Sequence, residues 1–226
     1  MREASLEMEQ LFLRATVLFA DRSDAGRVLA AVLEGERRPG LAVVGLARGG
    51  VAVAAEVARV LSAPLDVVAV RKVGHLWQPE YGIGAVTPGE GVYVRGPDGL
   101  TDEQVAVAVE EARVQAALLD RRLHADHVPL ALGGETVLVV DDGLATGATM
   151  IAAVRWARAA RAARVVAAVP VAAAESIDLI RGEADELVCP HLLSPFLAVG
   201  VWYESFDQVD DAEVIRLLEE NRRSFN

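Results

Sequence analysis

The stretch VLVVDDGLATGATM, from Val137 to Met150, constrains the fold more than any other part of the chain. It begins with four apolar residues that are typical of a buried strand, and two acids follow directly. A turn rich in glycine and threonine then leads into residues with helical spacing. The stretch therefore predicts a strand, a short turn and a helix, with two carboxylates where the strand ends.

The same alternation of strands and helices extends along most of the chain. Thr101 and Gln104 form a capping box that marks the start of a long helix. Strands joined through helices by short turns are βαβ units, which predict a mostly parallel sheet covered on both faces. We therefore expect a Rossmann-like three-layer α/β core. Strands are predicted at 41–45, 65–70, 136–140, 164–169 and 185–188, and helices at 51–62, 101–123, 148–161, 174–183 and 210–222.

Two segments interrupt this alternation. Residues 73–99 begin as a predicted loop and continue as a hairpin that turns at Pro88 and Gly89, whereas residues 189–210 are irregular and richer in aromatic side chains. We expect these segments to form a flap and a small hood over a core at about residues 41–188. The N-terminal segment, with Ser23 and Asp24 as expected helix caps, would join the hood of a single domain that spans residues 1–226.

Composition excludes several classes of protein. The net charge of −11 argues against a general nucleic-acid binder, and a single cysteine, Cys189, excludes a disulfide framework. Because no apolar run reaches the ~18 residues of a membrane helix and the first ten residues are too acidic for a signal peptide, we expect a cytoplasmic protein without membrane contact. The histidines show no ligand spacing, and we interpret them as surface or packing residues: His75, His124, His127 and His191.

The two acids and the turn after them require different ligand groups. Asp141 and Asp142 follow a predicted parallel strand, and open parallel sheets bind ligands beyond the carboxyl ends of their strands. Residues 143–149 offer backbone N–H groups, two hydroxyls and a helix N-terminus, which suit an anion. Carboxylates in contact with that anion would repel it by on the order of a few kcal/mol at an intermediate dielectric constant. They must therefore bind a different partner, either a divalent cation or sugar hydroxyls. A 5-phosphoribosyl group carries both a phosphate and a vicinal diol.

Other phosphate-binding motifs fit this stretch less well. Gly147, Ala148 and Thr149 lack the lysine of a Walker A loop, and the G-x-G-x-x-G pattern of dinucleotide sites is absent. An acidic pair of the receiver type would come early in the chain, beside a separate phosphorylated aspartate. The remaining alternative is an ordinary strand–turn–helix with incidental acids.

VLVVDDGLATGATM resembles the phosphoribosyl pyrophosphate signature of the type I phosphoribosyltransferases, in which four apolar residues and two acids precede T-G-x-T. The order of elements from about residue 41 to 188 is similar to the core of that family, so the resemblance covers about two-thirds of the chain and implies the family's fold. It implies that the acids bind the ribose hydroxyls, and Mg²⁺ mostly indirectly, while the loop binds the 5-phosphate. The phosphoribosyl-binding residues would be Asp141, Asp142, Gly143, Ala145, Thr146, Gly147, Ala148 and Thr149.

The resemblance also assigns residues to the pyrophosphate group. The turn GLARGG, at residues 45–50, matches a turn that binds pyrophosphate in the family, often through a non-proline cis peptide. A basic residue at the end of the second strand has the same role, and Lys72 is the only lysine of the chain, which fits a place that needs a compact ammonium group. The pyrophosphate-binding residues would be Ala47, Arg48, Gly49, Gly50, Arg71 and Lys72, and the catalytic ones Asp141, Asp142, Arg48 and Lys72.

The acceptor is less well defined by the sequence. The tail FLAVGVWYESF, at residues 196–206, resembles the aromatic base pocket of the 6-oxopurine enzymes, but Ala145 stands where those enzymes carry an aspartate. That difference argues against hypoxanthine or guanine. Adenine and uracil enzymes share Leu-Ala-Thr-Gly here, although the tail has no clear uracil-binding signature. The candidate acceptor-pocket residues are Leu144, Phe196, Trp202 and Tyr203, with Glu204 assisting Mg²⁺.

We therefore expect a Mg²⁺-dependent phosphoribosyltransferase that transfers the 5-phosphoribosyl group from phosphoribosyl pyrophosphate to a nitrogen acceptor such as a nucleobase, and releases pyrophosphate. The expected partners are phosphoribosyl pyrophosphate, a small-molecule acceptor and a second copy of the chain in a homodimer. The alternative is a non-catalytic regulator of the same fold that binds phosphoribosyl pyrophosphate or a nucleotide. The acidic charge and the absence of a DNA-binding domain argue against a regulator that acts on DNA.

Overall fold

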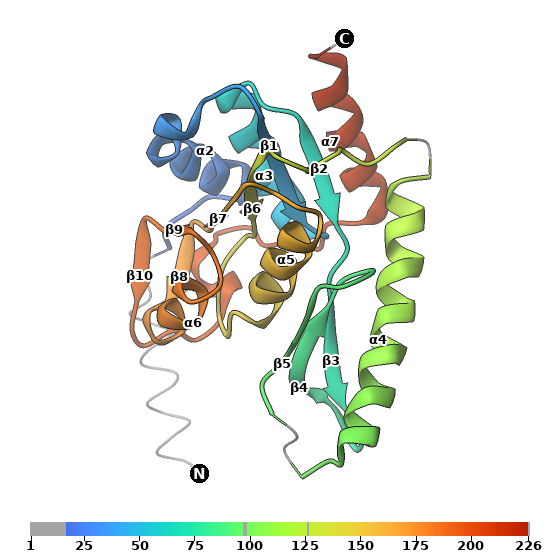
Figure 1. The fold of residues 1–226 in the computed structure, drawn as a ribbon. Coiled ribbons are helices and arrows are strands. Elements are labelled where there is room, and N and C mark those ends of the chain that lie inside the picture. The colour runs from blue at the N-terminus through green and yellow to red at the C-terminus, as the bar shows by residue number, and fades with distance from the viewer. Residues whose placement is uncertain (1–16, 97–98, 126, 226) are drawn as a thin grey trace.

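A computed structural model describes most of the chain, and a parallel five-stranded sheet lies at its centre (Figure 1). The described residues are 17–225 without 97, 98 and 126. The strand order is β2–β1–β6–β7–β9, and every neighbouring pair is parallel. The predicted α/β class and parallel sheet are confirmed. The strands are β1 (Leu41–Leu46), β2 (Leu65–Val68), β6 (Thr136–Val140), β7 (Arg164–Ala168) and β9 (Glu186–Val188).

Helices cover both faces of this sheet and complete the three layers (Figure 1). Side chains of β1 alternate between the layers: Val43 packs into the core on one face and Val44 into the core on the other. Because both faces are covered, β1 is buried along its whole length, which explains its uninterrupted apolar sequence. The first face carries α2 (Arg22–Val32), α3 (Gly49–Leu61) and α7 (Asp211–Arg223), and the second carries α5 (Ala148–Ala159) and α6 (Ile177–Arg181).

Several helix ends differ from the prediction. Helix α2 begins one residue after Asp21, whose carboxylate accepts a hydrogen bond from the Asp24 backbone at 2.7 Å, so the cap is Asp21 rather than Ser23 or Asp24. The helix expected at 174–183 is a 3₁₀ turn (Ala174–Ser176) followed by α6. In contrast, α4 (Asp102–Leu123) has the predicted capping box.

The flap is a three-stranded antiparallel ribbon that projects from the main sheet alongside α4 (Figure 1). The loop expected after residue 73 is wrong, because β3 (Arg71–His75) and β4 (Gln78–Val86) pair there, and β5 (Val92–Val94) completes the ribbon. Arg71 and Lys72 thus begin the flap instead of closing the second strand. The ribbon has its own small core on α4, formed by Val73, Ile83, Val86, Leu100 and Ala108.

The hood joins two distant parts of the chain. Phe19 is almost fully buried against Trp202 and Tyr203, and its backbone N–H donates to the Trp202 carbonyl at 3.1 Å. Beside this contact lie a short parallel strand pair, β8 (Val171–Ala173) with β10 (His191–Leu193), and a 3₁₀ turn (Val199–Trp202). The part of the N-terminal segment before residue 17, which was expected to join the hood, lies outside the described residues. Among the described helices, none has both the length and the apolar character that crossing a bilayer requires.

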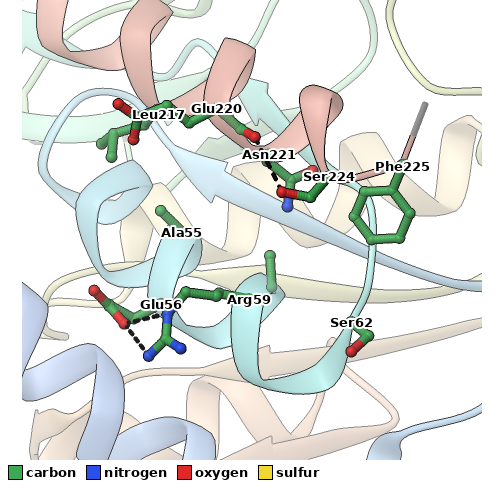
Figure 2. A pocket seen from close by; sticks show the side chains of 10 residues that line it. Ala55, Glu56, Arg59, Ser62, Leu217, Glu220, Asn221, Ser224 and Phe225 are labelled. Atoms are coloured by element: carbon green, nitrogen blue, oxygen red, sulfur yellow. Dashed lines mark hydrogen bonds and ion pairs between the residues drawn. The ribbon is translucent and has the colours of Figure 1, made fainter.

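A cavity of about 270 Å³ lies between the ends of α3 and α7, remote in sequence from the acidic stretch (Figure 2). Its polar lining has structural partners: Arg59 pairs with Glu56 at 2.8 Å, and Asn221 accepts a hydrogen bond from the Leu65 backbone at 2.8 Å. The Asn221 amide also donates to the Ala63 carbonyl. The two hydrogen bonds of Asn221 fasten α7 to the start of β2 and to the connection between α3 and β2.

Candidate functional site

One cavity at the carboxyl edge of the sheet collects most of the predicted site. Its volume is about 340 Å³, and the acidic pair after β6, the turn into α5 and the flap form its walls. Lys72 and the glycines of β4 contribute the flap side. The lining residues are Lys72, Gly82, Gly84, Asp141, Asp142, Gly143, Leu144, Ala145, Thr146, Gly147, Ala148, Thr149, Met150 and Val199.

The turn into α5 presents an open helix N-terminus to this cavity. Gly147 is the N-cap residue with a φ of +77°, a conformation that favours glycine, and no side chain of the described residues caps the helix. Helix α3, which begins at the same edge, also lacks a side-chain cap. Helices α2, α4 and α7, in contrast, are capped by the side chains of Asp21, Thr101 and Asp210. The two uncapped termini therefore retain N–H donors that suit anions.

The acidic pair is electrostatically unfavourable on its own. Burial raises the pKa of Asp141 well above its usual value, and the neighbouring charge of Asp142 raises it further. Burial also raises the pKa of Asp142, although Arg22 opposes this effect. The carboxylates therefore lack part of the solvation that they need, and a cation or hydroxyl donors would supply it.

Arg22 is a site residue that the sequence analysis missed. Its Nε donates to Asp142 Oδ2 at 2.8 Å, its guanidinium lies 3.8 Å from the centre of the Phe206 ring, and its Nη1 donates to the Asp207 carbonyl. The side chains of Arg22 and Asp142 are only 12% and 15% exposed. Arg22 also begins α2, where the helix dipole disfavours a cation. That mismatch between residue type and position is the signal that could have indicated it.

The turn between β1 and α3 lies directly against the acidic pair. The Ala47–Arg48 peptide bond is cis, as the family resemblance implied. A Cβ on Gly49 would lie 2.1 Å from Asp142 Oδ2, and one on Gly50 would lie 2.7 Å from the Val140 carbonyl oxygen. Position 50 therefore requires glycine, because its Cβ would meet the backbone at the end of β6, whereas a Cβ on Gly49 would displace the Asp142 carboxylate.

The predicted cations occupy different parts of the site. Lys72 is exposed and lines the cavity, where its charge lowers the pKa of Asp141. Arg48 does not line the cavity: its Nε donates to Asp211 Oδ1 of α7 at 2.6 Å, and Arg122 of α4 binds the other oxygen at 2.9 Å. Burial and the charges of Arg48 and Arg122 lower the pKa of Arg71, which places Arg71 beside this basic group.

The aromatic residues predicted for the acceptor pocket lie in the hood core instead. Tyr203 is 4% exposed, and its hydroxyl donates to the Asp142 carbonyl at 2.5 Å, so it supports the acidic pair from behind. Trp202 is buried against Phe196, with ring centres 6.0 Å apart. The reason is that the hood needs these large side chains to cover its own core. Glu204 is exposed and does not line the cavity.

Of the four predicted acceptor-pocket residues, Leu144 does line the cavity, and Val199 of the hood joins it there. Leu144 lines the cavity while most of its surface is buried, and its backbone N–H donates to the Val171 carbonyl at 2.9 Å. The Val199 side chain lies so close to Gly143 that a Cβ there would be 2.5 Å from it. Val199 was missed because it comes from the irregular hood, far along the chain from the acidic pair.

Comparisons with known proteins agree with this geometry. The family model described as phosphoribosyl transferase domain matches residues 24–203. Two curated proteins from strains of Mycobacterium tuberculosis, provisionally named phosphoribosyl transferases, are 43% identical over 215 residues, which is 92% of this chain. That alignment covers 48% of each relative, so the chain spans about half of their length. The crystal structure of TT1426 from Thermus thermophilus superposes with a TM-score of 0.77 at 38% identity, covering 90% of this chain and 98% of that one.

Proposed function

The chain belongs to the phosphoribosyl transferase domain family, and from this premise we propose that it transfers the 5-phosphoribosyl group of phosphoribosyl pyrophosphate to a nitrogen acceptor. The observation that carries the proposal is the composition of the cavity beyond β6. An acidic pair, an uncapped helix N-terminus and the one lysine of the chain line it together. A phosphate, a vicinal diol and a leaving pyrophosphate each find a complementary group there.

The donor would bind with its 5-phosphate at the turn into α5. The backbone N–H groups of residues 145–149 and the hydroxyls of Thr146 and Thr149 donate to phosphate oxygens, and the positive end of the helix dipole adds to the attraction. Asp141 and Asp142 accept hydrogen bonds from the ribose hydroxyls, which relieves their unfavourable burial. The acids and the turn thereby hold the two ends of one ligand.

The acidic pair also fits Mg²⁺. Its donors are carboxylate oxygens, the ligands that a hard divalent cation prefers, and their raised pKa values indicate a place short of positive charge. The chemistry supplied by bound Mg²⁺ is neutralisation of the charge that develops on pyrophosphate as it leaves. Asp141 and Asp142 would orient the cation, mostly through its water molecules.

The remaining steps use the chain's own residues. Lys72 and the uncapped N-terminus of α3 stabilise the departing pyrophosphate, and Arg48 reaches it by exchanging Asp211 for a phosphate oxygen. As the C1–O bond of the ribose breaks, the acceptor nitrogen forms the new C1–N bond from the opposite face and releases its proton to solvent. The flap covers the cavity and protects the electron-poor sugar from water.

A small nitrogen heterocycle, such as a nucleobase, is the acceptor class that we propose. Leu144 and Val199 offer an apolar wall that contacts a ring face, and Ala145 supplies no carboxylate to a 6-oxopurine. The acceptor would therefore be selected by shape and by backbone hydrogen bonds more than by charged side chains.

Pyrophosphate release tests this function. Purified protein would be incubated with phosphoribosyl pyrophosphate, Mg²⁺ and a panel of nucleobases, and pyrophosphate would be measured enzymatically. We expect acceptor-dependent release that falls by orders of magnitude in Asp141→Ala and Asp142→Ala, and that is unchanged in Asp178→Ala, a control whose side chain is 95% exposed. Near-normal rates in both acidic variants would refute the assignment. Donor binding without release for any acceptor would instead favour the non-catalytic regulator.

A further inference from the structure

A second group of potential ligands lies at the edge strand β2, two strands away from the β6 strand that carries the acidic pair. Asp66 is the second residue of β2 and is 4% exposed, which makes it one of the few buried carboxylates among the described residues. His124 caps the C-terminus of α4, and His127 follows in the next turn. One donor atom from each residue lies within 4.8 Å of the other two. We call Asp66, His124 and His127 the Asp66 cluster.

The contacts of His124 orient its ring toward Asp66. Nδ1 lies 3.1 Å from the Asp120 carbonyl oxygen and 3.2 Å from Asp120 Oδ1, so this nitrogen carries a proton and donates it. Nε2 is thereby left facing Asp66 Oδ1 at 3.0 Å. Two lone pairs cannot approach so closely without a positive centre between them. That centre is either a second proton on the ring or a metal cation.

The surroundings of the cluster match those of metal sites. A histidine ligand usually donates its other nitrogen to a carboxylate or carbonyl, as His124 does to Asp120, and ligating carboxylates are themselves hydrogen-bonded. Asp66 accepts from the Leu130 backbone at 2.7 Å through Oδ2 and from the Val67 backbone at 2.9 Å through Oδ1. Both His124 and Asp66 are therefore already fixed by outer partners.

His127 adds a third potential ligand to the pair of His124 and Asp66. Its ring centre lies 5.0 Å from that of His124 at an angle of 59°, so two imidazoles and one carboxylate converge. We propose that the Asp66 cluster binds a borderline divalent transition metal ion of the Zn²⁺ class.

The ligand set and its dimensions determine this choice of ion. Two imidazole nitrogens with one carboxylate suit Zn²⁺ or Co²⁺, whereas Mg²⁺ and Ca²⁺ prefer oxygen ligands throughout. Tetrahedral Zn²⁺ with bonds of about 2.0–2.2 Å separates its ligand atoms by about 3.3 Å. The 3.0 Å between His124 and Asp66 is close to that value. His127 would move by at most about 1.5 Å, within reach of a side-chain rotation, and the fourth position would take water.

A cation at this place would fasten α4 to the sheet. The N-terminal half of α4 supports the flap, and at its other end Arg122 shares Asp211 with Arg48. The ion would thus fix the helix that carries the flap without touching the cavity beside the acidic pair. This inference does not depend on the proposed transferase activity.

Titration of the chelator-treated full chain tests the site. Co²⁺ would be added first, since tetrahedral Co²⁺ gives intense visible absorption bands, and Zn²⁺ affinity would then be measured by displacement of Co²⁺. We expect one equivalent to bind with the bands of tetrahedral Co²⁺, and a melting temperature that rises with the free Zn²⁺ concentration in the wild type and much less in His127→Ala. His127→Ala should weaken binding at least tenfold, whereas His191→Ala, a control in β10, should leave it unchanged.

The choice of variants keeps the test decisive. His124→Ala removes the partner of Asp66 and could unfold the end of α4, so His127→Ala is the principal variant, with its fold checked by circular dichroism. Failure of the wild-type chain to bind a stoichiometric ion would overturn the proposal. Equal binding by wild type and His127→Ala would do the same, and would leave an imidazolium–carboxylate pair as the whole explanation.

Discussion

Replacement of Arg22 by methionine removes the counterion of Asp142 while keeping an apolar side chain over Phe206. The ion pair has an N–O distance of 2.8 Å, and unit charges about 4 Å apart attract by about 4 kcal/mol at an effective dielectric constant near 20. Loss of one partner of a fully buried pair costs about 3–5 kcal/mol. Since these side chains are 12% and 15% exposed, we expect Arg22→Met to lower the free energy of unfolding by about 2–3 kcal/mol at pH 8. For a chain of this size that corresponds to a fall in melting temperature of about 4–12 °C.

The loss should depend on pH with a definite sign. Because burial raises the pKa of Asp142 in the folded protein, ionisation of this carboxyl destabilises the fold as pH rises, and Arg22 limits that effect. Without Arg22 the folded pKa rises further, so the loss begins as the pH rises through the folded pKa of the wild type and is largest above the higher folded pKa of the variant. Below both folded pKa values the carboxyl is protonated in both folded proteins, and the loss disappears.

Urea unfolding followed by circular dichroism at pH 8 and pH 5 measures this difference. The matched control is Arg27→Met in the same helix, because Arg27 is 52% exposed and pairs with Asp24 at 3.3 Å. That surface pair should contribute at most about 1 kcal/mol. An Arg22→Met variant that loses no more than Arg27→Met, or whose loss is the same at both pH values, would refute the reasoning.

Three further predictions concern residues around the acidic pair and the cations of the site. Gly50→Ala should lower the free energy of unfolding by about 1–3 kcal/mol in urea unfolding, because its Cβ meets backbone of β6. Gly49→Ala should cost less stability but abolish donor binding, because its Cβ displaces Asp142. A larger loss of stability in Gly49→Ala than in Gly50→Ala would contradict this. Lys72→Ala should raise the donor dissociation constant at least tenfold with an unchanged melting temperature, and Lys72→Arg should restore it only in part, as titration calorimetry would show. Burial raises the pKa of Asp211, but hydrogen bonds from Arg48 and Arg122 outweigh burial and hold the pKa below its usual value. Asp211→Asn should therefore lower the free energy of unfolding by up to about 1 kcal/mol at pH 7. This loss should vanish once the pH falls through the lowered pKa.

Local sequence signals predicted the core of this fold well. The strand from Thr136 to Val140 has its predicted bounds, because a fully buried parallel strand requires an uninterrupted apolar run and the acids that end it are unambiguous. The capping box at Thr101 likewise fixed the start of α4. These elements depend on residues adjacent in sequence, so a single sequence is sufficient to find them.

Contacts between distant segments could not be predicted in the same way. Strand β3 of the ribbon begins only two residues after β2 ends, and only the packing of β3 on α4 distinguishes the two strands. Arg22 reaches Asp142 across 120 positions, and His124 reaches Asp66 across 58. Trp202 and Tyr203 were assigned to the acceptor pocket because aromatic side chains can stack on a base, yet the same property serves the hood core. Residue type alone does not separate these roles.

The central claim is that the acidic pair and the turn into α5 bind a phosphoribosyl donor. Calorimetric titration of the full chain with phosphoribosyl pyrophosphate, with and without Mg²⁺, on wild type and on Asp141→Asn tests it most directly. The account predicts saturable binding to the wild type that requires Mg²⁺ and is lost in the variant. Absence of binding to the wild type under both conditions would contradict it, and would mean that this cavity serves another phosphorylated diol.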